Sequence, residues 1–152
     1  MNTTRYNVLL IEDDLPAIDL ARRAVVECCS KIDLTVVGSG DAVLEWLKGS
    51  VAKHEQMPHI ILMDLKLPKL DGLAVMRKLR MHAGTRDIPI VAFSAEFTQA
   101  DVLMSYQVGA NSFVPMPIDL EQFKELFGER LAYWMRIHQH ETVSATGDDV
   151  TE

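Results

Sequence analysis

The stretch VLLIEDD, residues 8–14, decides the fold, because a short apolar run in it ends abruptly on acidic side chains. Two later stretches repeat the pattern: residues 60–64 read IILMD and residues 90–94 read IVAFS. Short apolar runs that end on polar residues are typical of strands buried on both faces of a parallel sheet. The loops at the carboxyl ends of such strands line one crevice. We therefore expect the polar groups that follow the three strands to lie close together at one edge of the sheet.

Segments with helical periodicity separate the strands along the chain. The predicted strands cover residues 6–12, 33–38, 59–64, 88–93 and 111–114. The predicted helices carry apolar stripes at Ile18, Ala21, Val25 and Cys28, at Val43, Leu44 and Leu47, and at Leu73, Met76 and Leu79, and the last helix covers about residues 119–138. Thr98 and Asp101 have the spacing of a capping box before a helix that Gly109 ends. Strands that alternate with helices indicate a parallel sheet covered on both faces.

Length and composition indicate a single domain. The chain has 152 residues, of which 48% are apolar. This is enough for one buried core and too little for a second domain of ordinary size. We expect the domain to cover residues 1–138. Residues 139–152 are polar, acidic and free of aromatic side chains, so a disordered tail is expected there.

Charge and hydropathy argue against two classes of partner. A net charge of −7 and a pI near 5.2 argue against nucleic acid, whose phosphates bind clustered Lys and Arg. No run approaches the roughly 18 apolar residues of a membrane span, and the polar start is not a signal peptide. We therefore expect a cytoplasmic protein with no nucleic-acid or membrane partner. The adjacent Cys28 and Cys29 form no disulfide framework and are interpreted as small apolar helix residues.

The acids at the strand ends suit a divalent cation. Glu12 and Asp13 are consecutive, so their side chains diverge and can meet a cation from two sides, and Asp64 follows another strand. Carboxylates, a backbone carbonyl and waters are the ligands that Mg²⁺ prefers. A bound Mg²⁺ or Mn²⁺ would let an anionic phosphodonor approach this negative cluster.

Phosphoryl transfer to Asp64 is the chemistry that these residues favour, because aspartyl phosphates are a known form of carboxylate catalysis. Ser94 could donate a hydrogen bond to a phosphoryl oxygen and move as it does so. Met116 stands where this chemistry would want a cation. A single acid after a strand is usually a helix cap, and Asp14 is interpreted in that way.

Four stretches together resemble the receiver domains of two-component response regulators: VLLIEDD, IILMDLKLPKLDG, IPIVAFSAE and GANSFVPMPID. The resemblance covers residues 6–138. It implies a flavodoxin-like α/β fold, in which a doubly wound parallel sheet has the strand order 2-1-3-4-5. It further implies that Asp64 is phosphorylated, that Glu12, Asp13, Asp64 and the carbonyl of Lys66 bind the metal, and that Ser94 and Phe113 are the switch residues.

Three shorter stretches, DLKLPKLDG, SYQVGANSFV and ERLAYWM, are similar to small single-domain receivers associated with bacterial phytochromes and related sensor kinases. The similarity implies a sensor histidine kinase as partner, phytochrome-like in kind, and a phosphorelay as the setting. In that setting the protein would be a signalling phosphoacceptor and not an enzyme, with at most self-catalysed phosphotransfer and dephosphorylation.

Met116 departs from the family's pattern. The family carries Lys there, and that Lys pairs with the aspartyl phosphate, so we expect altered switching. The alternative is a phosphorylation-independent pseudo-receiver that acts as a protein–protein interaction module. A haloacid-dehalogenase phosphatase needs a second Asp where Lys66 stands. A flavodoxin is also disfavoured, because the acids at residues 12–14 would repel the phosphate of a flavin.

Two expectations concern the surroundings of the pocket. Lys66 and Glu96 each follow a site residue by two positions, and opposite charges there could pair across the opening. In receivers these places influence how fast the phosphoryl group is lost, so both residues are expected to be kinetic modulators. The Met116–Pro117 peptide bond is expected to be cis, as the Lys-Pro bond of the family is.

The last helix carries more apolar surface than one buried stripe needs. Tyr133, Met135 and Ile137 lie beyond the stripe that can face the core. One interpretation is that the last helix makes a broad contact with the core and exposes the remaining apolar side chains, because ordinary proteins expose much apolar surface. We predict instead a homodimer through the last helix and its neighbours.

Overall fold

A five-stranded parallel sheet forms the centre of the computed structural model, which describes residues 5–29, 31–50, 57–67, 70–134 and 136. Its strands are β1 (Tyr6–Ile11), β2 (Ile32–Val37), β3 (Ile60–Asp64), β6 (Ile90–Ser94) and β7 (Ser112–Pro115). They lie side by side in the order β2-β1-β3-β6-β7. The predicted flavodoxin-like order 2-1-3-4-5 is therefore confirmed, and the predicted strand limits differ from the observed ones by one or two residues.

Helices follow the strands along the chain. They are α1 (Leu15–Cys28), α2 (Gly40–Ser50), α3 (Gly72–Met81), α4 (Gln99–Val108) and α5 (Leu120–Glu125). Local chemistry sets several of their ends: Thr98 and Asp101 form the predicted capping box, and Gly109 ends α4 with a φ of 134°. A positive φ of this size strains residues that carry a Cβ atom, whereas glycine adopts it with little strain. Asp14 caps α1, as predicted from the sequence.

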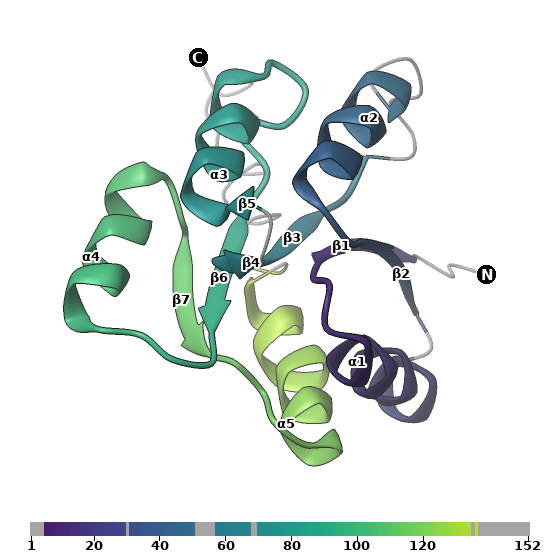
Figure 1. Ribbon diagram of the computed structural model, residues 1–152. Coiled ribbons are helices and arrows are strands. Elements are labelled where there is room, and N and C mark those ends of the chain that lie inside the picture. Colours follow the sequence, from purple (N-terminus) through teal and green to yellow (C-terminus); the bar gives the residue numbers. More distant parts are fainter. Residues whose placement is uncertain (1–4, 30, 51–56, 68–69, 135, 137–152) are drawn as a thin grey trace, which may run out of the picture.

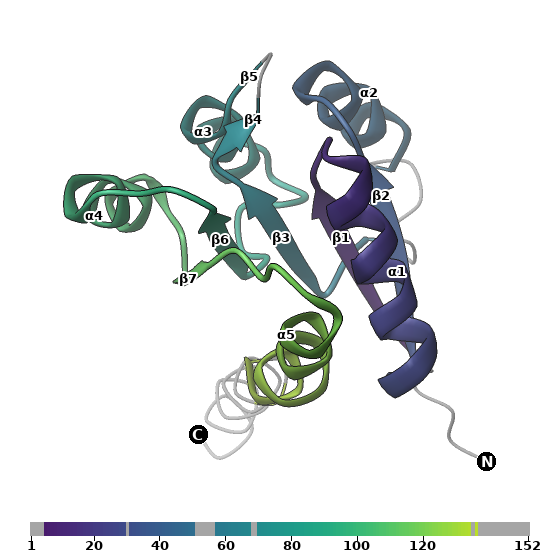
Figure 2. The same ribbon diagram turned by 60° about the horizontal axis from the view of Figure 1, so that its bottom comes forward.

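The helices cover both faces of the sheet. Figures 1 and 2 show α1 and α5 together on one face, while α2 and α3 lie on the other and α4 flanks the edge near β7. Two buried apolar clusters match these two faces, one packed under α1 and α5 and one under α2 and α3. An ion pair of 2.8 Å between Lys124 and Glu27 joins α5 to α1 at the surface. The central strands β3 and β6, and most of β1, are consequently buried on both sides, which explains their continuous apolar sequence.

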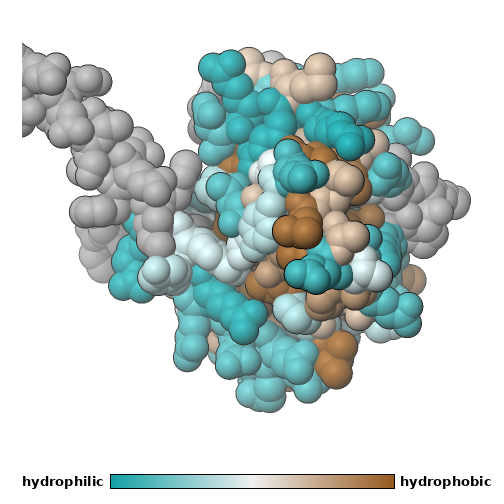
Figure 3. All heavy atoms as spheres, turned by 90° about the vertical axis from the view of Figure 1, so that its left-hand side faces the viewer, coloured by the Kyte–Doolittle hydropathy of each residue, from teal (hydrophilic) through white to brown (hydrophobic). Residues whose placement is uncertain are grey.

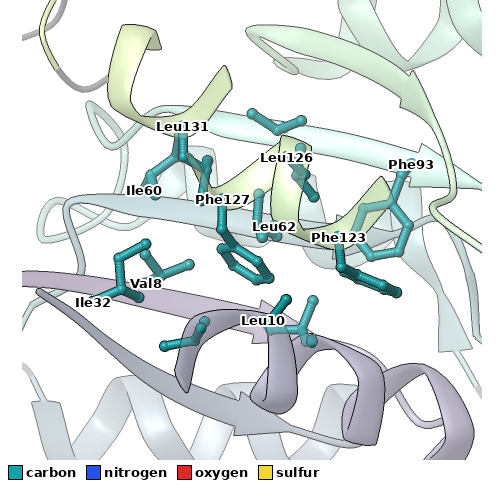
Figure 4. Packing of buried hydrophobic residues seen from close by; sticks show 14 of the residues in the cluster. Val8, Leu10, Ile32, Ile60, Leu62, Phe93, Phe123, Leu126, Phe127 and Leu131 are labelled. Atoms are coloured by element: carbon teal, nitrogen blue, oxygen red, sulfur yellow. The ribbon is translucent and has the colours of Figure 1, made fainter. Parts of the chain in front are cut away.

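Aromatic side chains of α5 and of the helical turn that continues it supply much of the larger core. Phe123 and Phe127 lie over Leu10 and Leu62 of the sheet, with their ring centroids 6.3 Å apart (Figure 4). Fully burying a side chain of this kind contributes about 1.5–3 kcal/mol. The last helix is thus fixed against the sheet by packing and not by helix propensity.

The last helix contains a feature that its sequence does not predict. Leu126–Arg130 forms a π-helical turn, after which helical structure continues through residues 131–134 and includes residue 136. Tyr133 is 56% exposed. Met135, Ile137 and the expected tail at 139–152 lie outside the described residues, so those expectations stay predictions. Among the helices described, none is both long and apolar enough to cross a membrane.

A short hairpin follows β3 where the sequence predicted only a loop. β4 (Lys66–Leu67) pairs antiparallel with β5 (Leu70–Asp71), directly before α3. Gly72 makes this turn possible, because a Cβ atom there would lie 2.6 Å from Cα of Leu65. No other residue type fits so close to a neighbouring backbone without a shift.

One expectation for α1 is wrong. Cys28 was placed on the buried stripe of the helix, but it is exposed, and its Sγ lies 3.7 Å from the carbonyl oxygen of Lys124. The physical reason is that the helix ends at this residue. Its buried face is formed instead by Ala17, Ala21, Ala24 and Val25.

Candidate functional site

The strand register brings the predicted site residues to one edge of the sheet. Ile11 is paired with Met63 across β1 and β3, so the next residues along, Glu12 and Asp64, follow side by side. On the other side of β3, Asp64 is paired with Phe93, which directly precedes Ser94. Glu12, Asp64 and Ser94 therefore lie near one another at the carboxyl ends of three neighbouring strands.

Glu12 is a buried acid with one oxygen left unbonded. Its side chain is 1% exposed, and Oε1 accepts hydrogen bonds of 3.0 Å from the backbone N–H groups of Asp13 and Asp14. Oε2 is buried and has no hydrogen-bond partner. Burial, with a smaller contribution from the nearby charge of Asp64, raises the pKa of Glu12 from its ordinary 4.5 to about 8. A cation or a proton is what this oxygen lacks.

Asp64 is nearly enclosed but still reachable. It is 8% exposed at the end of β3, and its Oδ1 accepts a hydrogen bond of 2.9 Å from the backbone N–H of Lys66. This bond orients the carboxylate and ties it to the start of the β4–β5 hairpin. An oriented carboxylate with access from solvent is what a nucleophile for phosphoryl transfer requires.

The third acid is not gathered into the same cluster. Asp13 is half-buried, and no three His, Cys, Asp or Glu side chains within the described ranges are already grouped as a metal site. The repulsion between like charges gives a physical reason, since close carboxylates are costly without a cation between them. The structure thus places the predicted ligands at one edge without assembling them. The orphaned Oε2 of Glu12 nevertheless fits a hard cation that takes oxygen ligands.

Ser94 lies at the end of β6 with its hydroxyl turned toward the following loop. It is 1% exposed, and Oγ donates a hydrogen bond of 2.8 Å to the carbonyl oxygen of Glu96. Ser94 also lines a cavity of about 200 Å³ together with Leu65, Lys66, Asp71, Leu73 and Asp101. The hydroxyl would have to leave Glu96 in order to donate to a phosphoryl oxygen on Asp64.

Phe113 packs against a ring from another segment. It is half-buried in β7, and its ring meets that of Phe97 edge to face with centroids 4.8 Å apart. The backbone N–H of Phe113 donates a hydrogen bond of 3.1 Å to the hydroxyl of Tyr106 on α4. β7 is therefore linked to both ends of the segment that contains α4. No sequence pattern predicts a role for Phe97, because it belongs to no apolar stripe.

Met116 packs away from the acids. Its backbone N–H donates a hydrogen bond of 3.0 Å to the carbonyl oxygen of Ser94, and its side chain packs against the core beneath α1 and α5. It also lines a second cavity, of about 180 Å³, together with Gln122 and Arg130 of the last helix. The expected cis bond before Pro117 is wrong, since the described residues contain no cis peptide bond. The chain enters α5 through Asp119, whose backbone is extended and whose side chain caps the helix.

Lys66 and Glu96 do not form the expected pair. Lys66 Nζ lies 3.5 Å from Oδ2 of Asp101 on α4, whereas Glu96 is exposed and contributes its carbonyl oxygen to Ser94. The N–H of Thr98, helped by the charge of Lys66, lowers the pKa of Asp101. Asp101 is the anion that lies within reach of the Lys66 ammonium. From the sequence, Asp101 is interpreted only as a capping residue, so its ion pair with Lys66 is not predicted.

Comparison with known proteins agrees with this geometry. The family model for the response regulator receiver domain matches residues 8–127. Among curated proteins, the probable methanogenesis regulatory protein FilR2 of Methanothrix harundinacea is 27% identical over 130 residues, which cover 86% of this chain and 84% of FilR2. The DNA-binding dual master transcriptional regulator RpaA of a Synechocystis strain is 29% identical over 76% of this chain, which spans only 44% of RpaA.

Three solved structures share the architecture. The phosphorylated cyanobacterial phytochrome response regulator RcpA has a TM-score of 0.75 and 25% identity, covering 86% of this chain and 94% of RcpA. The bacteriophytochrome response regulator RtBRR has a TM-score of 0.64 and 34% identity, covering 78% and 74%. The Mn²⁺-bound response regulator Rcp1 has a TM-score of 0.71 and 23% identity, covering 86% and 94%, a likeness of fold alone.

Proposed function

Because the chain belongs to the response regulator receiver domain family, we propose that it accepts a phosphoryl group on Asp64 from a sensor histidine kinase. Response regulators receive signals from sensor kinases, and divalent metal binding and phosphorylation are general features of the family. The observation that carries the proposal is the buried, unpartnered Oε2 of Glu12 next to Asp64. A structural acid in a core would be hydrogen-bonded, so this oxygen indicates a site prepared for a cation.

The proposed metal ligands are Glu12, Asp13, Asp64 and the carbonyl of Lys66, with Mg²⁺ or Mn²⁺ as the ion. When bound, such an ion neutralises carboxylate charge and takes phosphate oxygens as further ligands. The N–H of Lys66 holds Asp64 by its Oδ1 while the carboxylate attacks the phosphodonor. The N–H groups of Asp13 and Asp14 keep Glu12 in place at the same edge.

The proposed response begins at Ser94. Its hydroxyl exchanges the Glu96 carbonyl for a phosphoryl oxygen, which pulls on the loop that leads to Phe97 and α4. Phe113 follows through its contact with the ring of Phe97. We propose that this response is weaker than in receivers with a Lys at the place of Met116, because a thioether offers neither charge nor donor hydrogens.

A phytochrome-like kinase is the proposed partner, because RcpA and RtBRR are named as phytochrome response regulators and share at least 25% of residues with this chain. A second copy of the chain is the other proposed partner, through the last helix and its neighbours. Tyr133 is exposed on that helix. Figure 3 views the side on which α4 lies and shows hydrophobic residues exposed among polar ones. On α4 itself, Leu103, Met104 and Tyr106 have exposed side chains.

A phosphorylation-independent interaction module is the second candidate function. Met116 favours it, because the side chain packs on the core and supplies no cation. Such a module would bind its partners equally well with and without a phosphoryl group. Incorporation of a phosphoryl group at Asp64 separates the two candidates.

Fluorine NMR with beryllofluoride, a mimic of the phosphoryl group, tests the proposed site. We expect protein-bound fluoride signals in the wild type with Mg²⁺, none without Mg²⁺, and none in Asp64→Asn. Asp13→Ala should require much more Mg²⁺. Asp14→Ala is the matched control, since Asp14 caps α1 and should leave the Mg²⁺ requirement unchanged. Equal signals in Asp64→Asn would contradict the assignment.

A further inference from the structure

The cavity beside Asp64 contains one positively charged lining residue. Its six lining residues come from the segment after β3, the start of α3, the end of β6 and the start of α4. Lys66 carries the positive charge among them, and Ser94 carries the hydroxyl. A phosphoryl group placed on Asp64 would lie next to this lining, because Lys66 follows Asp64 by two residues and its N–H already holds the Asp64 carboxylate.

The side chain of Lys66 is only loosely engaged. Its ammonium group lies 3.5 Å from Asp101, and the two side chains are 52% and 38% exposed. A pair this long and this exposed contributes little and is easily exchanged for another partner. Asp101 does not depend on Lys66, since its Oδ2 also accepts a hydrogen bond of 2.8 Å from the backbone N–H of Thr98. Breaking the pair therefore leaves neither a buried charge nor an uncapped helix.

The charge balance of the phosphorylated pocket favours a cation in addition to the proposed metal ion. A phosphoryl group on Asp64 carries about two negative charges in place of the one of the free carboxylate, in a site that also contains Glu12 and Asp13. Met116 cannot neutralise this charge, because its side chain packs against the core under α1 and α5 and carries neither a charge nor a donor hydrogen. The ammonium of Lys66 carries three donor hydrogens at the end of a flexible side chain, and its ion pair with Asp101 is weak.

We infer that Lys66 supplies the cation that Met116 does not: when Asp64 carries a phosphoryl group, the Lys66 side chain leaves Asp101 and donates to a phosphoryl oxygen. The inference rests on the proposed phosphorylation of Asp64. The exchange also releases α4 from the β4–β5 hairpin, because the Lys66–Asp101 pair is a direct link between them. Phosphorylation is thereby sensed at the start of α4 through Lys66, in addition to Ser94.

The test measures beryllofluoride affinity, in the presence of Mg²⁺, in variants of the full chain. Lys66→Met should weaken the affinity by at least about tenfold, the expected loss for a hydrogen bond between charged groups. Lys66→Arg should retain most of it. In the double variant Lys66→Met with Met116→Lys, the restored ammonium should recover the affinity. Asp101→Asn should not weaken binding, since the amide oxygen can still accept from the Thr98 N–H while the charge that competes for Lys66 is removed.

Two readouts separate this role from a general effect of charge or folding. Lys78→Met removes the same charge from an exposed position on α3 and should leave the affinity unchanged. The amide resonances of residues 98–101 should shift when beryllofluoride binds the wild type, and should shift much less in Lys66→Met.

The outcomes also distinguish this inference from the proposed function. Equal affinity and equal amide shifts in the wild type and Lys66→Met would overturn the role of Lys66 and leave Asp64 as the phosphoacceptor. Absence of binding in the wild type and every variant would overturn the proposed function and this inference together.

Discussion

At the scale of single residues, Glu12 shows how the proposed metal site is arranged before a cation binds. The chain buries this carboxylate, holds Oε1 with two backbone N–H groups and leaves Oε2 without a partner. A buried polar atom without a hydrogen bond is costly. The molecule therefore carries a local instability that a cation relieves, and this instability should depend on pH.

The stability of the metal-free protein should fall as pH rises from about 4.5 to about 8. In this window the folded state keeps the proton of Glu12, whose pKa is raised from 4.5 to about 8, while the unfolded chain has lost it. The folded form binds more protons, so raising the pH favours unfolding. Urea denaturation in a chelator at several pH values measures this slope.

Glu12→Gln serves as the control for this pH dependence, because it removes the titrating group and keeps the side chain's shape. The variant should lose most of the slope. Added Mg²⁺ should stabilise the wild type most at the upper end of the window, where Glu12 is charged. A slope that is the same in both proteins would assign the effect to other groups.

Gly72 is the second residue whose replacement has a clear physical consequence. Gly72→Ala would place a Cβ atom 2.6 Å from Cα of Leu65, the residue that follows Asp64. Relief of such a contact requires a backbone shift, which costs about 1–3 kcal/mol for an overpacked site. We expect the free energy of unfolding to fall by that amount in chemical denaturation.

Gly128→Ala is the matched control, because a Cβ atom there meets nothing within 4 Å and the residue lies in a helical turn. It should be neutral, or stabilising by about 0.4–1 kcal/mol through a less flexible unfolded chain. If both variants lost the same stability, the close approach at Leu65 would not be the cause.

At the scale of elements, Arg80 joins the end of α3 to two loops. These loops precede β6 and β7 and therefore lie at the opposite ends of the strands from the site. Its guanidinium donates to the carbonyl oxygens of Gly109, Arg86 and Ile88 at 2.7–3.0 Å and to Oδ1 of Asn111 at 2.7 Å. One side chain thus joins α3 to the segments that precede β6 and β7. The position of α4 depends on this anchor at its carboxyl end.

Arg80→Met should destabilise the fold by about 2–4 kcal/mol. Hydrogen bonds to charged groups contribute about 1.5–3 kcal/mol each, and their effects do not simply add. Arg77→Met on the same helix is the control, since Arg77 is exposed and should change stability little. Urea denaturation compares the two variants, and equal losses would show that the hydrogen bonds of Arg80 are not the cause.

Elements with a strong local signal were predictable from the sequence, and elements set by tertiary contacts were not. The apolar strands, the Thr98–Asp101 capping box and the Gly109 stop follow from local rules, so prediction and structure agree. The β4–β5 hairpin and the π-helical turn have no comparable pattern. The predicted partner of Lys66 was wrong for the same reason. The choice between Glu96 and Asp101 depends on where α4 lies.

At the scale of the whole molecule, α4 and the last helix both expose apolar side chains. Exposed apolar side chains lie on α4 at Leu103, Met104 and Tyr106, and Tyr133 is exposed on the last helix. Exposed apolar side chains that gather on one face often mark an interface. They support the proposed assembly of two copies through the last helix and its neighbours.

The protein should form a homodimer at roughly tens of micromolar, where even a micromolar interface is populated. Tyr133→Glu should shift the mass measured by light scattering toward the monomer, because a charge would be buried at the contact. Met81→Glu, at the exposed end of α3 on the opposite face of the sheet from α5, is the control and should leave the mass unchanged. A monomer mass for the wild type at that concentration would contradict the dimer.

The most direct test of the account is the transfer of one phosphoryl group to Asp64. The protein is mixed with a small phosphodonor and Mg²⁺, and its intact mass is measured beside that of Asp64→Asn and of a sample with chelator. We predict the gain of a single phosphoryl group in the wild type with Mg²⁺, and no gain in the other two. No gain in the wild type, or an equal gain in Asp64→Asn, would contradict the assignment of this chain as a metal-dependent phosphoacceptor.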